Sequence, residues 1–178
     1  MIYIALLRGI NVGGGNKVDM KKLKQTFESL RFENVRTYIN SGNVIFETKA
    51  SSEDTLAKTI EAEIAKDFQL SIPALVRSAK NIQAISRATP EDWINNTEIK
   101  TDVIFLWPEI DSKKILKEFP INPDIETLIY TNGALVWNIE RKHYGKSKVP
   151  KVILGKVYKQ ITIRNINTVR KLNSLLLE

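Results

Sequence analysis

The stretch Val35–Thr48, VRTYINSGNVIFET, decides the fold. Its two ends, 35–39 and 44–48, are rich in β-branched and aromatic residues and are separated by Asn40-Ser41-Gly42-Asn43. These residue types tolerate positive φ angles and make tight connections, so the pattern predicts a β-hairpin.

The segments before the hairpin predict a strand and a helix. Residues 2–7 are a continuous apolar run of strand length, which the glycine-rich loop 9–16 ends. Asp19 stands where a helix N-cap belongs, and apolar residues then recur every three or four positions up to Leu30. A helix over 19–31 is therefore expected.

The segments after the hairpin complete a βαββαβ unit over residues 1–78. Ser51 and Ser52 offer N-caps, and Leu56, Ile60 and Ile64 follow at helical spacing before a strand at 73–77. Residues 79–100 then predict a helical linker with a turn near Pro90.

The same order begins again in residues 101–178. The predicted elements are a strand at 102–107, a helix at 111–119, a hairpin of 125–130 and 135–139, a short helix at 151–157, a strand at 160–163 and a helix at 168–177 capped by Asn167. Tyr38–Val44 also resembles Tyr130–Val136 at the equivalent turn. The expected fold is α+β, a duplicated ferredoxin-like plait with two subdomains.

Composition limits the function classes. The chain has no cysteine, which excludes disulfides and thiolate sites and favours a reducing compartment, so we expect a cytoplasmic protein. Its first residues, MIYIALLR, lack a basic leader and reach a charge after seven positions, so neither a signal peptide nor a membrane association is expected.

The net charge of +7 is concentrated late in the chain. From Arg141 to Lys171 there are ten basic residues and no acidic one, and Tyr144 and Tyr158 lie within this run. Such a segment suits nucleic-acid phosphates and stacked bases, although a solvated lysine surface would explain it equally well.

Two polar loops are expected to meet at one edge of the first sheet. With a right-handed crossover, the end of the first strand and the turn after the second lie at the same edge. The backbone amides there, the following helix N-terminus and Arg8 would form a cradle for an anion. The predicted ligand-binding residues of this edge are Arg8, Asn11, Gly13, Asn40, Ser41 and Asn43. The alternative is that the glycines and asparagines only permit tight turns, since no Walker or GxGxxG motif fits.

Arg164 and Asn165 are further candidate ligand-binding residues, because they stand between the last strand and the last helix. Arg164 could equally pair with an acidic side chain. His143 is the only histidine, so no multi-histidine metal site or histidine-based triad is expected, and no catalytic residue or cofactor can be named.

Three motifs resemble a known family. LRGINVGG at 7–14, TYINSGNV at 37–44 and TIRN at 162–165 are similar to those of a widespread bacterial family, domain of unknown function 1697. The resemblance covers nearly the whole chain and departs at Ile166-Asn167, where members often carry a tryptophan. It implies a duplicated α+β plait, and it implies no activity, cofactor or catalytic residue.

Three functional hypotheses follow. The leading one is a binding protein for a phosphorylated ligand, either a nucleotide or a nucleic acid. The second is a small phosphotransfer or acyl-phosphate hydrolysing enzyme that would use Arg8 with Asn11 or Asn43. The third is an interaction module that dimerises through an exposed sheet edge.

Overall fold

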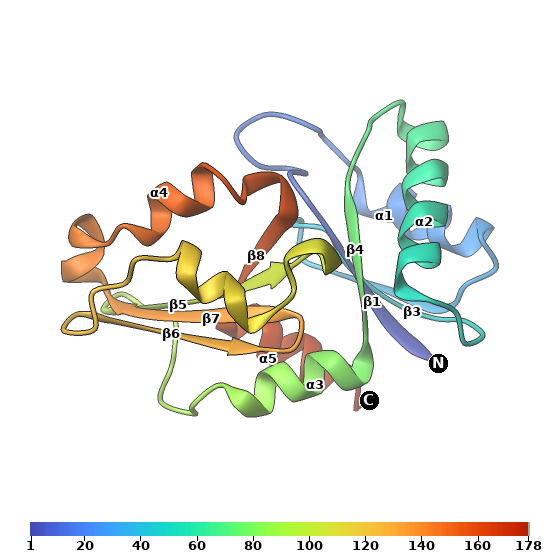
Figure 1. Cartoon of the computed structure of the whole chain (residues 1–178). Coiled ribbons are helices and arrows are strands. Elements are labelled where there is room, and N and C mark those ends of the chain that lie inside the picture. The colour runs from blue at the N-terminus through green and yellow to red at the C-terminus, as the bar shows by residue number, and fades with distance from the viewer. Residues whose placement is uncertain (178) are drawn as a thin grey trace. The chain divides into compact units, whose positions relative to one another are not determined.

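The computed structural model describes residues 1–177 and contains two compact units. The N-terminal unit is Met1–Lys80, and the C-terminal unit begins at Asn81. Each has a four-stranded antiparallel sheet with helices, so the fold is α+β with two subdomains (Figure 1). The division into 1–78, 79–100 and 101–178 stays a prediction, and its last residue, Glu178, lies outside the described residues.

The N-terminal unit has the predicted element order. Its elements are β1 (Ile2–Leu7), α1 (Met20–Ser29), β2 (Glu33–Tyr38), β3 (Asn43–Glu47), α2 (Glu53–Phe68) and β4 (Ala74–Ser78). The strand order is β2-β3-β1-β4, and every neighbouring pair is antiparallel.

Both helices of this unit cover the same face of its sheet (Figure 1). Alternate β1 side chains, Tyr3, Ala5 and Leu7, pack in one core with apolar residues of α1 and α2. The predicted N-caps are confirmed for both helices: Asp19 accepts from Lys22 N, and Ser52 accepts from Thr55 N.

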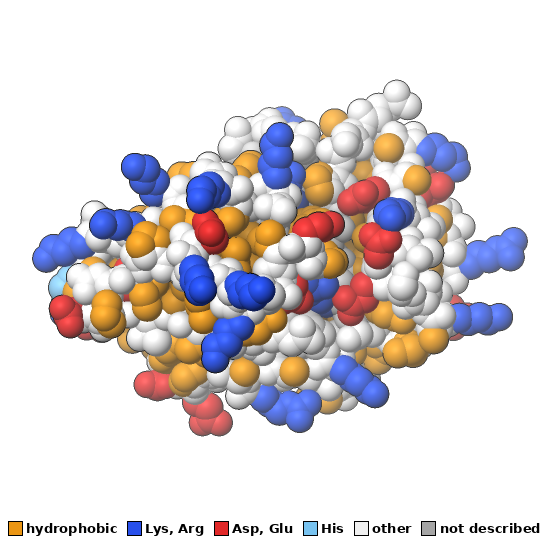
Figure 2. Space-filling view, viewed as in Figure 1, with side chains coloured by type: hydrophobic (Ala, Val, Ile, Leu, Met, Phe, Trp, Pro, Cys, Tyr) orange, Lys and Arg blue, Asp and Glu red, His pale blue; other side chains and the backbone are white. Residues whose placement is uncertain are grey.

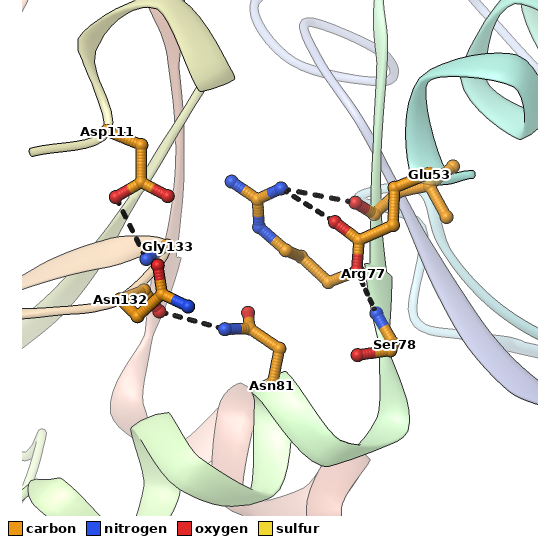
Figure 3. Close-up of polar contacts among 8 residues, drawn as sticks. Glu53, Arg77, Ser78, Asn81, Asp111, Asn132 and Gly133 are labelled. Atoms are coloured by element: carbon orange, nitrogen blue, oxygen red, sulfur yellow. Dashed lines mark hydrogen bonds and ion pairs between the residues drawn. The ribbon is translucent and has the colours of Figure 1, made fainter.

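A single glutamate ties the start of α2 to the end of β4. Glu53 accepts a hydrogen bond from Ser78 N at 2.7 Å and forms an ion pair with Arg77 at 3.0 Å (Figure 3). The Arg77 side chain is 5% exposed and that of Glu53 is 36% exposed, so the guanidinium is buried while the carboxylate is in partial contact with water. Removing the carboxylate would break both of these contacts.

The C-terminal unit repeats the strand order with different helices. Its elements are α3 (Ala79–Ala88, which begins two residues before the unit boundary), β5 (Ile99–Leu106), η1 (Pro108–Ile110), η2 (Lys113–Glu118), β6 (Glu126–Thr131), β7 (Ala134–Glu140), η3 (Arg141–Lys146), α4 (Val149–Leu154), η4 (Tyr158–Gln160), β8 (Ile161–Asn165) and α5 (Ile166–Leu175), where η denotes a 3-10 helix. Its strand order is β6-β7-β5-β8.

Two predicted helices of this unit differ in type or position. The α-helix predicted at 111–119 is wrong, because this region contains the 3-10 helix η2, and a second 3-10 helix, η1, precedes it. Pro120 disfavours α geometry at Phe119, which is extended, so the helical turns end at Glu118. The helix predicted at 151–157 begins earlier, at Val149, and ends at Leu154 before Gly155.

The last helix is capped by a different asparagine than predicted. Asn165 accepts from Thr168 N at 2.9 Å, and α5 begins at Ile166 rather than at residue 168. Ile166 is fully buried, so the helix must start early enough to turn this side chain inward. Asn167 is exposed and instead donates to Asn95 O at 2.8 Å.

Buried polar contacts brace the hairpin β6–β7. The Glu126 carboxylate accepts from Trp137 Nε1 at 2.8 Å, from Ser147 Oγ at 2.6 Å and from Asn122 N at 3.0 Å. At the hairpin turn Asp111 accepts from Gly133 N, and Asn132 O accepts from Asn81 (Figure 3). The turn is therefore held from two segments outside the hairpin.

None of the helices in residues 1–177 has the length and apolar character that a membrane span requires.

Candidate anion-binding site

The loop after β1 and the turn between β2 and β3 meet, as predicted from the topology. Leu7 N donates to Gly42 O at 2.8 Å, and Asn11 Nδ2 donates to Asn40 O at 2.9 Å. Strand β2 ends at Tyr38, one residue before the predicted end, because Ile39 takes a left-handed φ of 50° to start the turn.

Asn11 organises the loop. Its Nδ2 also donates to Val18 O at 3.0 Å, and its Oδ1 accepts from Val18 N at 2.9 Å. With φ 54° the residue lies in the left-handed region, which asparagine tolerates better than most residues. The Asn11 side chain thus closes the loop by binding Val18, the residue before Asp19, and also links the loop to the turn.

Gly42 permits the close approach of the two segments. A Cβ atom at this position would lie 2.7 Å from Ile10 Cδ1 and 2.8 Å from Leu7 Cβ. Its φ of 77° is also one that L residues rarely adopt. Both the space and the backbone angle therefore require glycine.

An open cleft of about 580 Å³ lies beside this junction. It is lined by Asn11, Gly14, Gly15, Lys17, Val18, Asp19, Met20, Lys21 and Asn40. Two of these, Asn11 and Asn40, are predicted site residues. Lys17 and Lys21 were not predicted as site residues. They lie on either side of the N-cap Asp19 and next to the glycine-rich loop, and this pattern marks them as candidates.

The electrostatics of the cleft favour an anion by a small margin. Lys17 and Lys21 are exposed, and among the described residues 1–177 neither side chain forms a salt bridge or hydrogen bond. The first N–H groups of α1 have no intrahelical acceptor and carry partial positive charge. Asp19 opposes them, but its Oδ1 is occupied by Lys22 N at 2.7 Å. Two ammonium groups against one carboxylate leave a net charge of +1 among the lining side chains.

The other predicted residues of this edge do not line the cleft. Arg8 is partly buried, and its backbone N–H donates to Pro73 O. Gly13 is exposed at φ 59° in the loop. Asn43 is fully buried and donates to Tyr38 O and Ser41 Oγ, so its amide closes the hairpin turn. A ligand role for these residues stays a prediction.

Arg164 and Asn165 lie on β8 of the C-terminal unit. Arg164 Nη1 donates to Thr162 Oγ1 at 3.0 Å and to Ile163 O at 2.8 Å. Burial lowers the pKa of Arg164 to about 10, so the guanidinium stays charged at neutral pH. Asn165 serves as the cap of α5. Both residues thus have structural contacts, and a ligand role for either stays a prediction.

Most of the cationic run from Arg141 to Lys171 divides into three groups. Arg164 is buried, and Arg141 and Arg170 donate to backbone carbonyls of segment 90–96. Lys142 and Lys156 form exposed ion pairs with glutamates. A third group consists of exposed lysines with no salt bridge within residues 1–177, namely Lys146, Lys148, Lys151 and Lys159.

Comparison with known families identifies the chain. The model of a family described as "Protein of unknown function (DUF1697)" matches residues 1–137. The chain belongs to the DUF1697 family. The match confirms the resemblance noted in the sequence: its range includes the motifs at 7–14 and 37–44, while the motif at 162–165 lies outside it.

A solved structure is similar to the chain beyond the range that the family model matches. "The structure of conserved bacterial protein SP0830 from Streptococcus pneumoniae" is 28% identical, covers 98% of both chains and has a TM-score of 0.81. This chain is therefore similar to a conserved bacterial protein over nearly its whole length. No curated protein matches it.

Proposed function

We propose that this DUF1697 protein binds a phosphorylated ligand of the nucleotide class in the cleft of its N-terminal unit. The observation that supports the proposal most is the placement of Lys17 and Lys21 on a cleft that also contains the N-terminus of α1 and the backbone of Gly14 and Gly15. Helix N-termini and glycine amides bind phosphate oxygens in many unrelated folds.

The size and lining of the cleft favour more than an isolated phosphate. Its volume of about 580 Å³ falls within the range of small-molecule sites. Val18 and Met20 add apolar surface next to the lysines, and Asn11 and Asn40 add amides. A nucleotide combines the matching groups: phosphates, an apolar ring and hydrogen-bonding edges.

The test is isothermal titration of ADP, with inorganic phosphate as a second ligand, into the intact chain. Each exposed ammonium–phosphate contact contributes about 0.5–1 kcal/mol. The double variant Lys17→Ala/Lys21→Ala should therefore weaken ADP binding about five- to thirtyfold.

A matched control is the double variant Lys49→Ala/Lys80→Ala. It removes the same charge from two exposed lysines that do not line the cleft. The control should bind ADP like the natural chain. Equal weakening by both variants, or no binding of either ligand, would refute the proposal.

The structure gives less support to oligomers formed through the edge strand β2. Its pairing with β3 shifts register between Glu33 and Arg36, and Asn34 there has a φ of 49°. Bulges and charged residues at an edge hinder pairing with another chain.

We also propose that the two units are duplicated copies of a ferredoxin-like plait. The matching strand orders, β2-β3-β1-β4 and β6-β7-β5-β8, support this. The absence of cysteine supports the further proposal of a cytoplasmic location.

A further inference from the structure

A second concave surface lies wholly within the C-terminal unit. It is a groove of about 400 Å³ between the segment of η1 and η2 and the segment that leads into η4. The lining residues are Ile110, Ser112, Lys114, Ile115, Glu118, Lys156, Val157 and Gln160. The groove thus combines aliphatic side chains with hydroxyl and amide groups that can form hydrogen bonds.

The segments on both sides of the groove are rich in lysine. On one side η2 carries Lys113, Lys114 and Lys117, all exposed. On the other side the segment 146–159 contains five lysines and no acidic residue. Figure 2 shows lysine and arginine side chains standing out over the η2 and α4 segments, with hydrophobic side chains between them.

Acidic residues balance the lysines on one side of the groove only: residues 108–118 contain Glu109, Asp111 and Glu118, whereas residues 146–159 contain no acidic residue. Glu118 lines the groove, but Lys156 pairs with it at 3.0 Å. Within residues 1–177, Lys114 and Lys159 form no salt bridge. Each of these ammonium groups can therefore contact a phosphate without breaking an ion pair of the protein.

Aromatic and apolar side chains are exposed on the same lysine-rich segment. Tyr158, the first residue of η4, is 50% exposed, and Leu154 at the end of α4 is 73% exposed. A tyrosine ring between lysines provides a stacking surface for a base, next to cations for the backbone phosphates.

We propose that the groove between η2 and η4 binds a single-stranded nucleic acid. Lysines of both segments would contact the phosphates, and the apolar lining with Tyr158 would contact unstacked bases. A polyanion matches the charge of the surface, and the groove and the exposed ring match flexible single strands better than a rigid duplex. This site is separate from the nucleotide site proposed above and does not depend on it.

The experiment measures fluorescence anisotropy of labelled twelve-nucleotide oligo(U) and oligo(dT) with the intact chain over a range of salt concentrations. The variant Lys114→Glu/Lys159→Glu should weaken binding and make the slope of log K against log salt shallower by about 1.4, since each lost phosphate contact changes it by about 0.7. Tyr158→Ala should weaken binding about tenfold with the slope unchanged. Comparing the two oligonucleotides shows which nucleic acid is preferred.

Control variants distinguish binding at this groove from a general effect of charge. Lys49→Glu/Lys80→Glu has the same net charge change and should leave oligonucleotide binding within twofold of the natural chain. Vesicles containing phosphatidylserine and a duplex of equal length test the competing partners. No oligonucleotide binding at low salt, equal loss with the control, or tighter binding to vesicles or duplex would each overturn the proposal.

Discussion

The substitution Gly42→Ala tests whether the junction of loop and turn depends on the close packing described above. A methyl group at this position would lie 2.8 Å from Leu7 Cβ, an atom next to the backbone that cannot move aside by a change of rotamer. Overpacking of this kind costs about 1–3 kcal/mol. The left-handed φ of 77° adds about 1–2 kcal/mol for any residue with a Cβ.

The expected loss in the free energy of unfolding is therefore about 2–5 kcal/mol. Gly14→Ala is the matched control, because Gly14 has a φ of 80° but no atom within 4 Å of its added Cβ. It should lose only the backbone contribution of about 1–2 kcal/mol. The difference between the two variants isolates the steric contact.

The assay is urea unfolding followed by far-ultraviolet circular dichroism. All three tryptophans, Trp93, Trp107 and Trp137, belong to the C-terminal unit, so their fluorescence follows that unit in the same sample. Exchange of the Leu7 amide, which donates to Gly42 O, reports on the junction itself. If Gly42→Ala proves as stable as Gly14→Ala, close packing at this junction does not contribute to stability and the reasoning is refuted.

Three further predictions concern single side chains. Asn11→Asp should destabilise the protein by about 1–3 kcal/mol in urea unfolding, because a carboxylate cannot donate to Val18 O and Asn40 O; an unchanged midpoint would contradict the role of Asn11. Asn165→Ala should lower the free energy of unfolding, followed by tryptophan fluorescence, by about 1 kcal/mol, because Asn165 caps α5. Asn167→Ala should lower it by less than about 0.5 kcal/mol, and the reverse order would favour Asn167 as the cap. The pKa of Tyr130 is raised by burial and by its hydrogen bond to Asp111, so its contribution to stability is complete below the ordinary tyrosine pKa and is lost as pH rises through the raised value. Absorbance titration at alkaline pH should show Asp111→Asn lowering this pKa, with Tyr130→Phe to assign the signal; a pKa that does not move would exclude Asp111 as a cause.

Local signals predicted much of the N-terminal unit. The caps Asp19 and Ser52 were predictable because each precedes an apolar pattern of helical period. The contact of the glycine-rich loop with the turn followed from topology alone, since a right-handed crossover brings both to one edge. Lys17 and Lys21 were missed because the prediction considered only the loop and turn residues, although the position of both lysines around the N-cap Asp19 was a usable signal.

Predictions for the C-terminal unit failed where two signals compete. Segment 111–119 has helical spacing, but Pro120 forces Phe119 into an extended conformation, and the turns before it are of the 3-10 type. At the last helix, both Asn165 and Asn167 are suitable caps. Ile166, Val169 and Leu172 form the buried face, and including Ile166 in the periodicity would have selected Asn165.

Phosphate binding in the cleft beside α1 can be measured directly by titrating ADP into the ¹⁵N-labelled chain and following the amide resonances of Gly14, Gly15 and Lys21. We expect saturable shifts at these three amides that disappear in Lys17→Ala/Lys21→Ala and persist in Lys49→Ala/Lys80→Ala. Resonances that stay in place at saturating ADP, or that shift only elsewhere in the chain, would contradict the proposed site.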